Sequence, residues 1–275
     1  MRDKSATRDL QPIRKVIQRF NLGAKRSLGQ NFLLDLNITD RIARTCGDLS
    51  QSNIIEIGPG PGGLTRALLE NGANKVTVIE RDSRSVAAIR DLSFHYPNRL
   101  KVIEDDALKI RIQDIAEPPI KIIANLPYNI ATPLLISWLK ELDGIKKLVL
   151  MFQREVAERL IARPGTKAYG RLSVITQYLC EVRCAFNLPK NAFVPPPKVM
   201  STLVELTPRL RPIEKATLYS LELVTAAAFG QRRKMLRSSL KPLGLDPTEA
   251  GIEPTRRAEE LTPQDFFTLA QLINK

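Results

Sequence analysis

Short apolar runs alternate along the chain with stretches in which apolar residues recur every three or four positions. Helical patterns separate five of these runs, which predicts a parallel, doubly wound α/β sheet. The five runs have the length and β-branched content of buried strands, and they lie near residues 53–58, 75–80, 100–105, 120–126 and 146–152. Two more strand candidates, near 178–187 and 201–207, flank a loop with three consecutive prolines and suggest a closing hairpin.

The pattern changes at Pro208-Arg209-Leu210-Arg211-Pro212, where the prolines mark a linker. Beyond it, residues 213–275 contain short helical patterns and no strand signal. A chain of 275 residues is long enough for one sizeable domain and a smaller one. We therefore expect an α/β domain over 1–208, which begins with a basic segment over 1–30, and a small all-α domain over 213–275.

The first predicted strand leads into a glycine-rich turn, Gly58-Pro59-Gly60-Pro61-Gly62-Gly63, and then into a helical pattern. Glycines let a ligand approach the backbone closely, and the helix N-terminus behind them favours an anionic group. The second strand ends in Glu80, where an acid can hold ribose hydroxyls. The third runs into Asp106, a carboxylate that can accept the amino group of an adenine. The glycines and Glu80 fit a nicotinamide or flavin nucleotide as well as S-adenosylmethionine.

The fourth strand ends abruptly in Asn125-Leu126-Pro127-Tyr128. This order suits alkylation of the exocyclic amine of a planar base, whose lone pair is delocalised into the ring. An Asn oxygen and a nearby backbone carbonyl can accept both N–H bonds, while Tyr128 offers a face for stacking. Asn, Pro and Tyr are also common in ordinary strand-to-loop turns. The acids that follow the neighbouring strands favour the chemical interpretation, because all these strand ends meet at one edge of the sheet.

Eight blocks of sequence occur in a fixed order over roughly residues 25–207. They are SLGQNFL (27–33), EIGPG (56–60), VIERD (78–82), DA (106–107), NLPYNI (125–130), QREVAERL (153–160), YGRLSV (169–174) and FVPPPKV (193–199). In these blocks the chain resembles the ribosomal RNA adenine dimethyltransferases, in particular the bacterial small-subunit enzymes and their eukaryotic and organellar relatives. The joint occurrence of the blocks is very specific. Residues 61–63 occupy a loop position that varies in the family, and the first two dozen residues match no known block.

The resemblance implies a Rossmann-like class I S-adenosylmethionine-dependent methyltransferase sheet of seven strands, the last of them antiparallel. It also implies S-adenosylmethionine as the cofactor, without a metal. The cofactor-binding positions that it implies are Asn31 and Leu33 as a cap, Gly58 and Gly60 at the amino-acid end, Glu80 at the ribose hydroxyls, Asp106 at the adenine amine and Asn125 between cofactor and target.

The same resemblance places the target base between Tyr128 and Phe193, with Asn125 beside its amine, and we take these three residues as catalytic. The base must leave its stack to reach them. The reaction needs no acid, because the sulfonium leaving group departs neutral, so the protein must chiefly hold the amine in line with the methyl group. His95 is the only histidine, and we expect it at the surface.

The net charge of +13 is unevenly distributed along the chain. Residues 1–30 hold 8 Lys and Arg against 2 Asp and Glu, and residues 163–241 hold 14 against 4, so the remainder is slightly acidic. Basic surfaces beside a near-neutral core are typical of proteins that bind nucleic acid phosphates. We expect Arg232, Arg233, Lys234 and Arg237 to form a basic helix face on RNA. A solvated helix is the alternative.

The three cysteines, Cys46, Cys180 and Cys184, form neither a metal quartet nor an even disulfide set, and we expect buried thiols in a reducing cytosol. No apolar run approaches a membrane span, so we expect a cytoplasmic protein without membrane contact. An organellar transit peptide is a weaker alternative, because the Arg-rich start of the chain also contains Asp3 and Asp9.

Two classes of function fit these observations. The first is an enzyme that transfers methyl groups from S-adenosylmethionine to N6 of two adjacent adenosines in a hairpin loop near the 3′ end of 16S rRNA, within the assembling small ribosomal subunit. The second is a binding protein built on a methyltransferase fold. The intact set Glu80, Asp106, Asn125 and Tyr128 favours the enzyme. Leu126 and the FVPPP block favour the small-subunit group over the large-subunit enzymes of antibiotic resistance. We expect a monomer.

Overall fold

The computed structural model describes residues 10–25, 28–209 and 214–273. Parts of the predicted basic segment and most of the predicted linker therefore lie outside the described residues. The chain divides into two compact units. The first contains residues 1–154 and 184–206, and the second contains residues 155–183 and 207–275.

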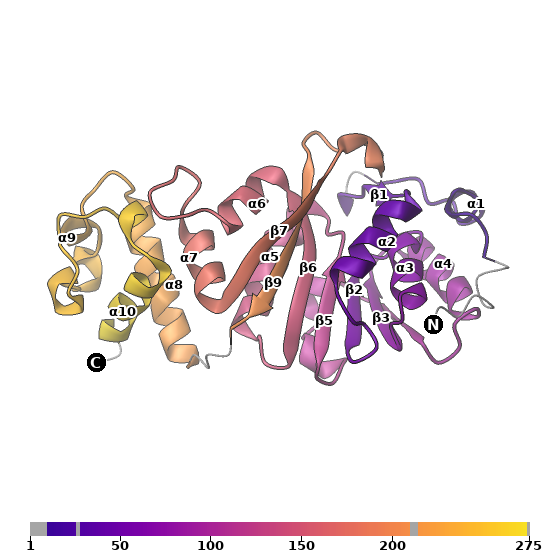
Figure 1. Ribbon diagram of the computed structural model, residues 1–275, viewed down its shortest axis with the longest axis horizontal. Helices are drawn as coiled ribbons and strands as arrows, with labels where there is room; N and C mark the ends of the chain where they lie inside the picture. The colour runs from indigo at the N-terminus through magenta and orange to yellow at the C-terminus, as the bar shows by residue number, and fades with distance from the viewer. Residues whose placement is uncertain (1–9, 26–27, 210–213, 274–275) are drawn as a thin grey trace. The chain divides into compact units, whose positions relative to one another are not determined.

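A seven-stranded sheet forms with the order β4-β3-β2-β5-β6-β9-β7 (Figure 1). Its strands are β2 (Asn53–Ile57), β3 (Lys75–Glu80), β4 (Leu100–Glu104), β5 (Ile120–Ala124), β6 (Ile145–Gln153), β7 (Cys180–Leu188) and β9 (Ser201–Pro208). The first five pair in parallel, and β9 pairs antiparallel with β6. The predicted sheet and its antiparallel last strand are confirmed.

Five helices belong to the first unit, two before β2 and three between the strands of the sheet. They are α1 (Ile13–Arg19), α2 (Leu36–Thr45), α3 (Gly63–Glu70), α4 (Ser83–Ser93) and α5 (Tyr128–Lys140). Asp35 and Asp82 cap α2 and α4 by accepting hydrogen bonds from the backbone two residues later. Figure 1 shows α2, α3 and α4 grouped beside β2 and β3. Apolar side chains of α2 and α3 share one buried core with β2, β3, β5 and β6.

A second, two-stranded sheet was not predicted. In it, β1 (Phe32–Leu33) pairs antiparallel with β8 (Phe193–Val194), so that Leu33 lies opposite Phe193. Each strand has only two residues, which is too short to leave an alternating pattern in the sequence. The pairing holds the N-terminal segment against the proline-rich loop between β7 and β9.

The second unit consists of helices α7 (Arg171–Leu179), α8 (Lys215–Gly230), α9 (Leu236–Ser239) and α10 (Pro263–Ile273), with most of α6 (Arg154–Leu160). Its described part also contains an isolated bridge between Met235 and Arg257. Residues 155–183 were expected in the first domain, yet they cluster with the C-terminal helices. Aromatic packing accounts for this difference, because Tyr178 stacks on Phe267 with ring centroids 4.5 Å apart.

The prediction that Arg232, Arg233, Lys234 and Arg237 form one helix face is wrong. Helix α8 ends at Gly230, and Arg232, Arg233 and Lys234 lie in the turn before α9, to which Arg237 belongs. The turn is closed by a hydrogen bond from Lys234 N to Gln231 O of 2.8 Å. Arg232 donates through Nε to Glu259 at 2.9 Å, so its guanidinium is held against its own unit.

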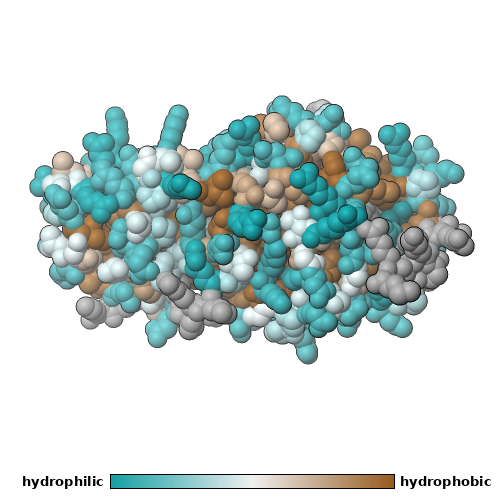
Figure 2. Space-filling model, viewed as in Figure 1, coloured by the Kyte–Doolittle hydropathy of each residue, from teal (hydrophilic) through white to brown (hydrophobic). Residues whose placement is uncertain are grey.

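Two of the three cysteines are buried as expected, but Cys184 is exposed. Burial raises the pKa of Cys46 and of Cys180 to about 12, which keeps both as neutral thiols. On the face seen in Figure 2, hydrophilic residues cover most of the surface and hydrophobic ones show in scattered areas. Within the described ranges, no helix is long and apolar enough to cross a membrane.

Candidate active site

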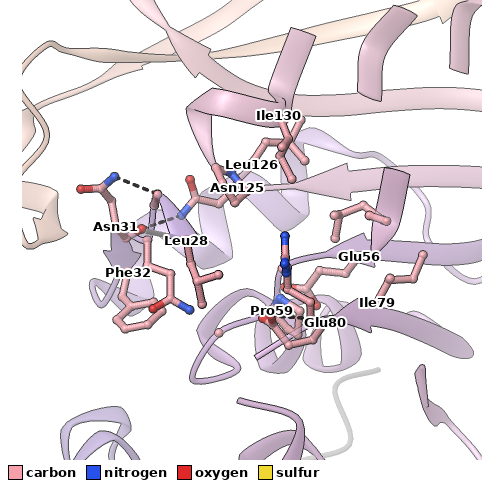
Figure 3. A pocket seen from close by; sticks show the side chains of 18 of the residues that line it. Leu28, Asn31, Phe32, Glu56, Pro59, Ile79, Glu80, Asn125, Leu126 and Ile130 are labelled. Atoms are coloured by element: carbon pink, nitrogen blue, oxygen red, sulfur yellow. Dashed lines mark hydrogen bonds between the residues drawn. The ribbon is translucent and has the colours of Figure 1, made fainter. Parts of the chain in front are cut away.

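One cavity collects residues from the carboxyl ends of β2, β3, β4 and β5 and from residues 28–33 (Figure 3). Parallel strands place these ends at the same edge of the sheet, which is where open α/β sheets bind ligands. The structure brings eight of the predicted site residues into the cavity wall, namely Asn31, Leu33, Gly58, Gly60, Glu80, Asp106, Asn125 and Tyr128. Phe193 is not among the lining residues.

The glycine-rich turn after β2 forms the floor of this cavity. Gly58 and Gly60 have φ angles of +66° and +54°, in the left-handed region that disfavours other residues. A Cβ on Gly60 would lie 2.9 Å from the ring of Phe32. The absence of a side chain at Gly60 therefore lets the N-terminal segment close over the turn while the backbone stays accessible to a ligand.

Glu80, at the end of β3, is held in place by the backbone that follows it. Its Oε1 accepts hydrogen bonds from Arg81 N at 2.8 Å and Asp82 N at 2.9 Å, and the side chain is only 7% exposed. Burial raises the pKa of this carboxyl, while backbone N–H groups of Asp82, Arg81 and Gly60 oppose the shift. Because Oε1 accepts the bonds from Arg81 N and Asp82 N, Oε2 is the oxygen more open to a ligand.

Asp106 shares its two oxygens between the backbone and a neighbouring arginine. Its Oδ1 accepts from Leu108 N at 3.1 Å, and its Oδ2 lies 3.5 Å from Nη1 of Arg81. Arg81 also lines the cavity, although sequence reasoning assigned it no role. The position of Arg81 directly after Glu80, the acid at the end of β3, could have indicated that it lines the site. The pair puts one cation and one carboxylate together at the rim.

The amide of Asn125 is oriented by the N-terminal segment. Its Nδ2 donates to Asn31 O at 3.1 Å, and Asn31 in turn donates through Nδ2 to Gly29 O at 3.3 Å; Figure 3 shows both bonds. Because the amino side of the Asn125 amide is bound to a carbonyl, its Oδ1 remains as an acceptor. An acceptor fixed in this way is what an exocyclic amine requires.

Tyr128 begins α5 directly after Pro127 and lines the cavity. Its hydroxyl and that of Ser201 are 2.5 Å apart, and burial raises the pKa of the phenol. Phe193, the predicted partner of Tyr128, is 1% exposed and belongs to the buried core. Among the described residues, these two rings make no ring contact with each other.

Gln30 and Asp82 fasten the N-terminal segment beside the cavity. Gln30 Nε2 donates to Asp82 Oδ2 at 3.0 Å, and Arg84 bridges that carboxylate at 2.7 Å to the carbonyl oxygens of Asn21 and Gly23. Hydrogen bonds from Arg84 and Gln30 lower the pKa of Asp82 to about 2. The carboxylate thus stays ionised and keeps the segment in place.

Comparison with known proteins decides the family. A family model described as Ribosomal RNA adenine dimethylase matches residues 21–275. The chain belongs to this family. The activity of the family is transfer of methyl groups from S-adenosylmethionine to adenine in ribosomal RNA, and the class I methyltransferase sheet predicted from the sequence is confirmed.

Several curated members of the family are similar over almost their whole length. "Ribosomal RNA small subunit methyltransferase A" of Rhodospirillum rubrum is 56% identical over 268 residues, covering 96% of this chain and 93% of that protein. The protein with the same name from Paramagnetospirillum magneticum is 55% identical, covering 97% and 96%.

Solved structures agree with the family assignment. A dimethyladenosine transferase from Plasmodium falciparum superposes with a TM-score of 0.75 at 27% identity, covering 87% of this chain and 96% of that one. The 23S rRNA methyltransferase ErmE superposes with a TM-score of 0.66 at 28% identity, covering 89% and 100%.

The cavity has the chemistry that S-adenosylmethionine requires. A glycine turn open to the backbone can take the amino-acid end, and carboxylates follow β3 and β4 in the order that a ribose and an adenine need. A further carboxyl, that of Glu56, is buried in the wall with an oxygen that has no hydrogen-bond partner. These features fit a cationic adenosyl cofactor.

Proposed function

We propose that this family member dimethylates N6 of two adjacent adenosines in the hairpin loop near the 3′ end of 16S rRNA, within the assembling small ribosomal subunit. The similarity to two small-subunit enzymes at 55–56% identity supports the choice of substrate. The observation that carries the chemistry is the amide of Asn125, whose amino side is bound to Asn31 O and whose oxygen is left to accept.

The cofactor would be held by residues of four strand ends and the N-terminal segment. Glu80 Oε2 would accept from the ribose hydroxyls, and Asp106 Oδ2 from the adenine amine. Asn31 and Leu33 would cover the molecule, and the glycine turn would take its amino-acid end. S-adenosylmethionine supplies an electrophilic methyl group whose departure leaves a neutral thioether.

Asn125 acts on the target amine. Its Oδ1 accepts one N–H of the adenine amino group, and a backbone carbonyl of the same strand end accepts the other. Both bonds draw the lone pair out of the ring and direct it toward the methyl group, so the barrier falls through positioning. After transfer, the nitrogen loses a proton to water. A singly methylated amine keeps one N–H, for which one acceptor suffices, and the same site can therefore act twice.

Tyr128 holds the base. The target adenosine must leave its stack, and the Tyr128 ring in the cavity wall offers it a new one. The hydrogen bond between the hydroxyls of Tyr128 and Ser201 fixes the ring in this place. For Phe193 to stack on the opposite face, as the resemblance implies, its ring would have to leave the core when RNA binds.

The rRNA would be held mainly through its phosphates. The exposed turn with Arg233 and Lys234, followed by Arg237 in α9, supports this role, while Arg232 is partly engaged by Glu259. We take a monomer as the working unit. An enzyme for bacterial ribosome assembly would act in the cytoplasm.

The test is primer extension on ribosomal RNA. N6,N6-dimethyladenosine has no hydrogen left for Watson–Crick pairing, so reverse transcriptase stops at each site. Cells that lack this chain should lose two adjacent stops near the 3′ end of the small-subunit rRNA, and the wild-type chain should restore them. Asn125→Ala should not restore them, because the amine would stay planar. Stops that persist without the chain, or that change only in large-subunit rRNA, would exclude the proposed substrate.

A further inference from the structure

Glu56 is a buried carboxyl in the cavity wall that has no assigned role. It is the penultimate residue of β2, its side chain is 1% exposed, and it lines the cavity beside Ile57 and Gly58. Its Oε2 has no hydrogen-bond partner. Figure 3 shows Glu56 with Glu80 among the lining side chains. A buried polar atom without a partner is unfavourable, which indicates that a group of the ligand completes this site.

The surroundings of Glu56 favour the neutral acid until a cation arrives. The pKa of Glu56 is raised to about 8, mainly by burial and in part by the charge of Glu80 on β3, while the hydroxyl of Thr65 on α3 opposes both. On the β5 side, Asn125 is uncharged. The only cation among the lining residues is Arg81, which is paired with Asp106. Among the lining residues, no unpaired cation therefore compensates a negative charge on Glu56.

We propose that the Glu56 carboxyl carries a proton in the free enzyme and loses it to solvent when a cation of the cofactor enters the cavity. S-adenosylmethionine has two cations, the ammonium of its amino-acid end and the sulfonium. Either one would pair with the carboxylate and stabilise its ionised form. The inference rests on cofactor binding and does not depend on which ribosomal RNA is the substrate.

The proton makes cofactor affinity depend on pH in a defined direction. The pKa of Glu56 is high in the free enzyme and lower in the complex, so binding releases a proton at every pH between these two values. Affinity should then rise with pH by up to about tenfold per unit, and level off above the pKa of the free enzyme. Because the sulfur of the reaction product is neutral, the protonation of Glu56 would also depend on whether the methyl group has been transferred.

The test is calorimetry of cofactor binding at pH 7 in two buffers that differ in ionisation enthalpy. The difference in heat gives the number of protons released. Wild-type enzyme should release close to one proton more than Glu56→Gln, since a free-enzyme pKa of about 8 leaves the acid mostly protonated. The amine of the cofactor titrates equally with both proteins, so its contribution cancels when their proton releases are compared. The matched control is Glu104→Gln, which alters an exposed carboxyl on β4 of the same sheet and should behave as wild type.

S-adenosylhomocysteine distinguishes the two cations. Equal Glu56-dependent release with both molecules identifies the ammonium, and release with S-adenosylmethionine alone identifies the sulfonium. Either outcome supports the proposal. Equal release by wild type and Glu56→Gln would overturn it, even if both enzymes methylate rRNA.

Should Glu56→Gln fail to fold, wild-type enzyme suffices. Its affinity for S-adenosylmethionine is then measured between pH 6 and 8 and corrected for the titration of the free cofactor. An affinity that does not change with pH would refute the proposal.

Discussion

Replacement of Glu80 by alanine should weaken S-adenosylmethionine binding by at least tenfold. The side chain is 7% exposed, and its Oε1 is already committed to two backbone N–H groups. We therefore expect the loss of cofactor affinity to come from the missing bond between Oε2 and the ribose hydroxyls. A hydrogen bond to a charged group contributes about 1.5–3 kcal/mol, and 1.4 kcal/mol corresponds to a factor of ten. One such bond thus predicts a loss of about ten- to 150-fold.

The assay is a cycle of titrations with two ligands and three proteins. Wild type, Glu80→Ala and the exposed control Glu104→Ala are each titrated with S-adenosylmethionine and with an analogue that lacks both ribose hydroxyls. Glu80→Ala should matter for the natural cofactor and much less for the analogue, because only the former has the groups that Glu80 binds. Equal losses with both ligands would mean that Glu80 acts through the backbone it holds, and an unchanged affinity would remove it from the site.

Tyr128→Leu should lower the rate of methyl transfer at saturating cofactor, because it removes stacking worth roughly 1–3 kcal/mol. Tyr128→Phe should keep most of the wild-type rate. Single-turnover kinetics, together with cofactor titrations, would test both expectations. A collapse of cofactor affinity with an intact rate would contradict the role given to this ring. Reversing Arg233 and Lys234 to Glu should weaken binding to small subunits and flatten its salt dependence, because phosphate contacts release counterions. Arg232→Ala should have less effect on that salt slope, since its guanidinium already pairs with Glu259; binding by the double variant that matches wild type across a salt titration would refute this assignment.

The sheet and most of the cavity could be predicted because they depend on local signals. Buried parallel strands are short apolar runs, such as β5, in which every residue is buried. Glycines mark the positions that need positive φ, and the residues at strand ends follow the chain order of the strands. Once the topology is assumed, Glu80, Asp106 and Asn125 must meet at one edge.

The remaining features depend on contacts that no local pattern records. The sequence near Phe193 is rich in prolines and suggests an exposed ring, yet pairing of β8 with β1 buries it. The basic run 232–234 looks helical by composition, but the chain leaves α8 at Gly230. The sequence shows that Glu56 is an acid within a predicted buried strand. Whether its carboxyl has a hydrogen-bond partner depends on the side chains of every neighbouring element, which no local pattern gives. Residues 155–183 join the C-terminal helices through the stacking of Tyr178 on Phe267, which are separated by about a third of the sequence.

The bond from Asn125 to Asn31 has a consequence for how the enzyme becomes active during folding. The two residues are 94 positions apart, so we expect this contact to form after the pairing of neighbouring strands, because closing a longer loop costs more entropy. A nascent chain with a complete sheet and a loose N-terminus would contain every acid that binds the cofactor. Its Asn125 amide would nevertheless rotate freely. Such a chain would also lack the cover that Asn31 and Leu33 give the cofactor, so docking of residues 28–33 would complete the cofactor site and the methylation site together.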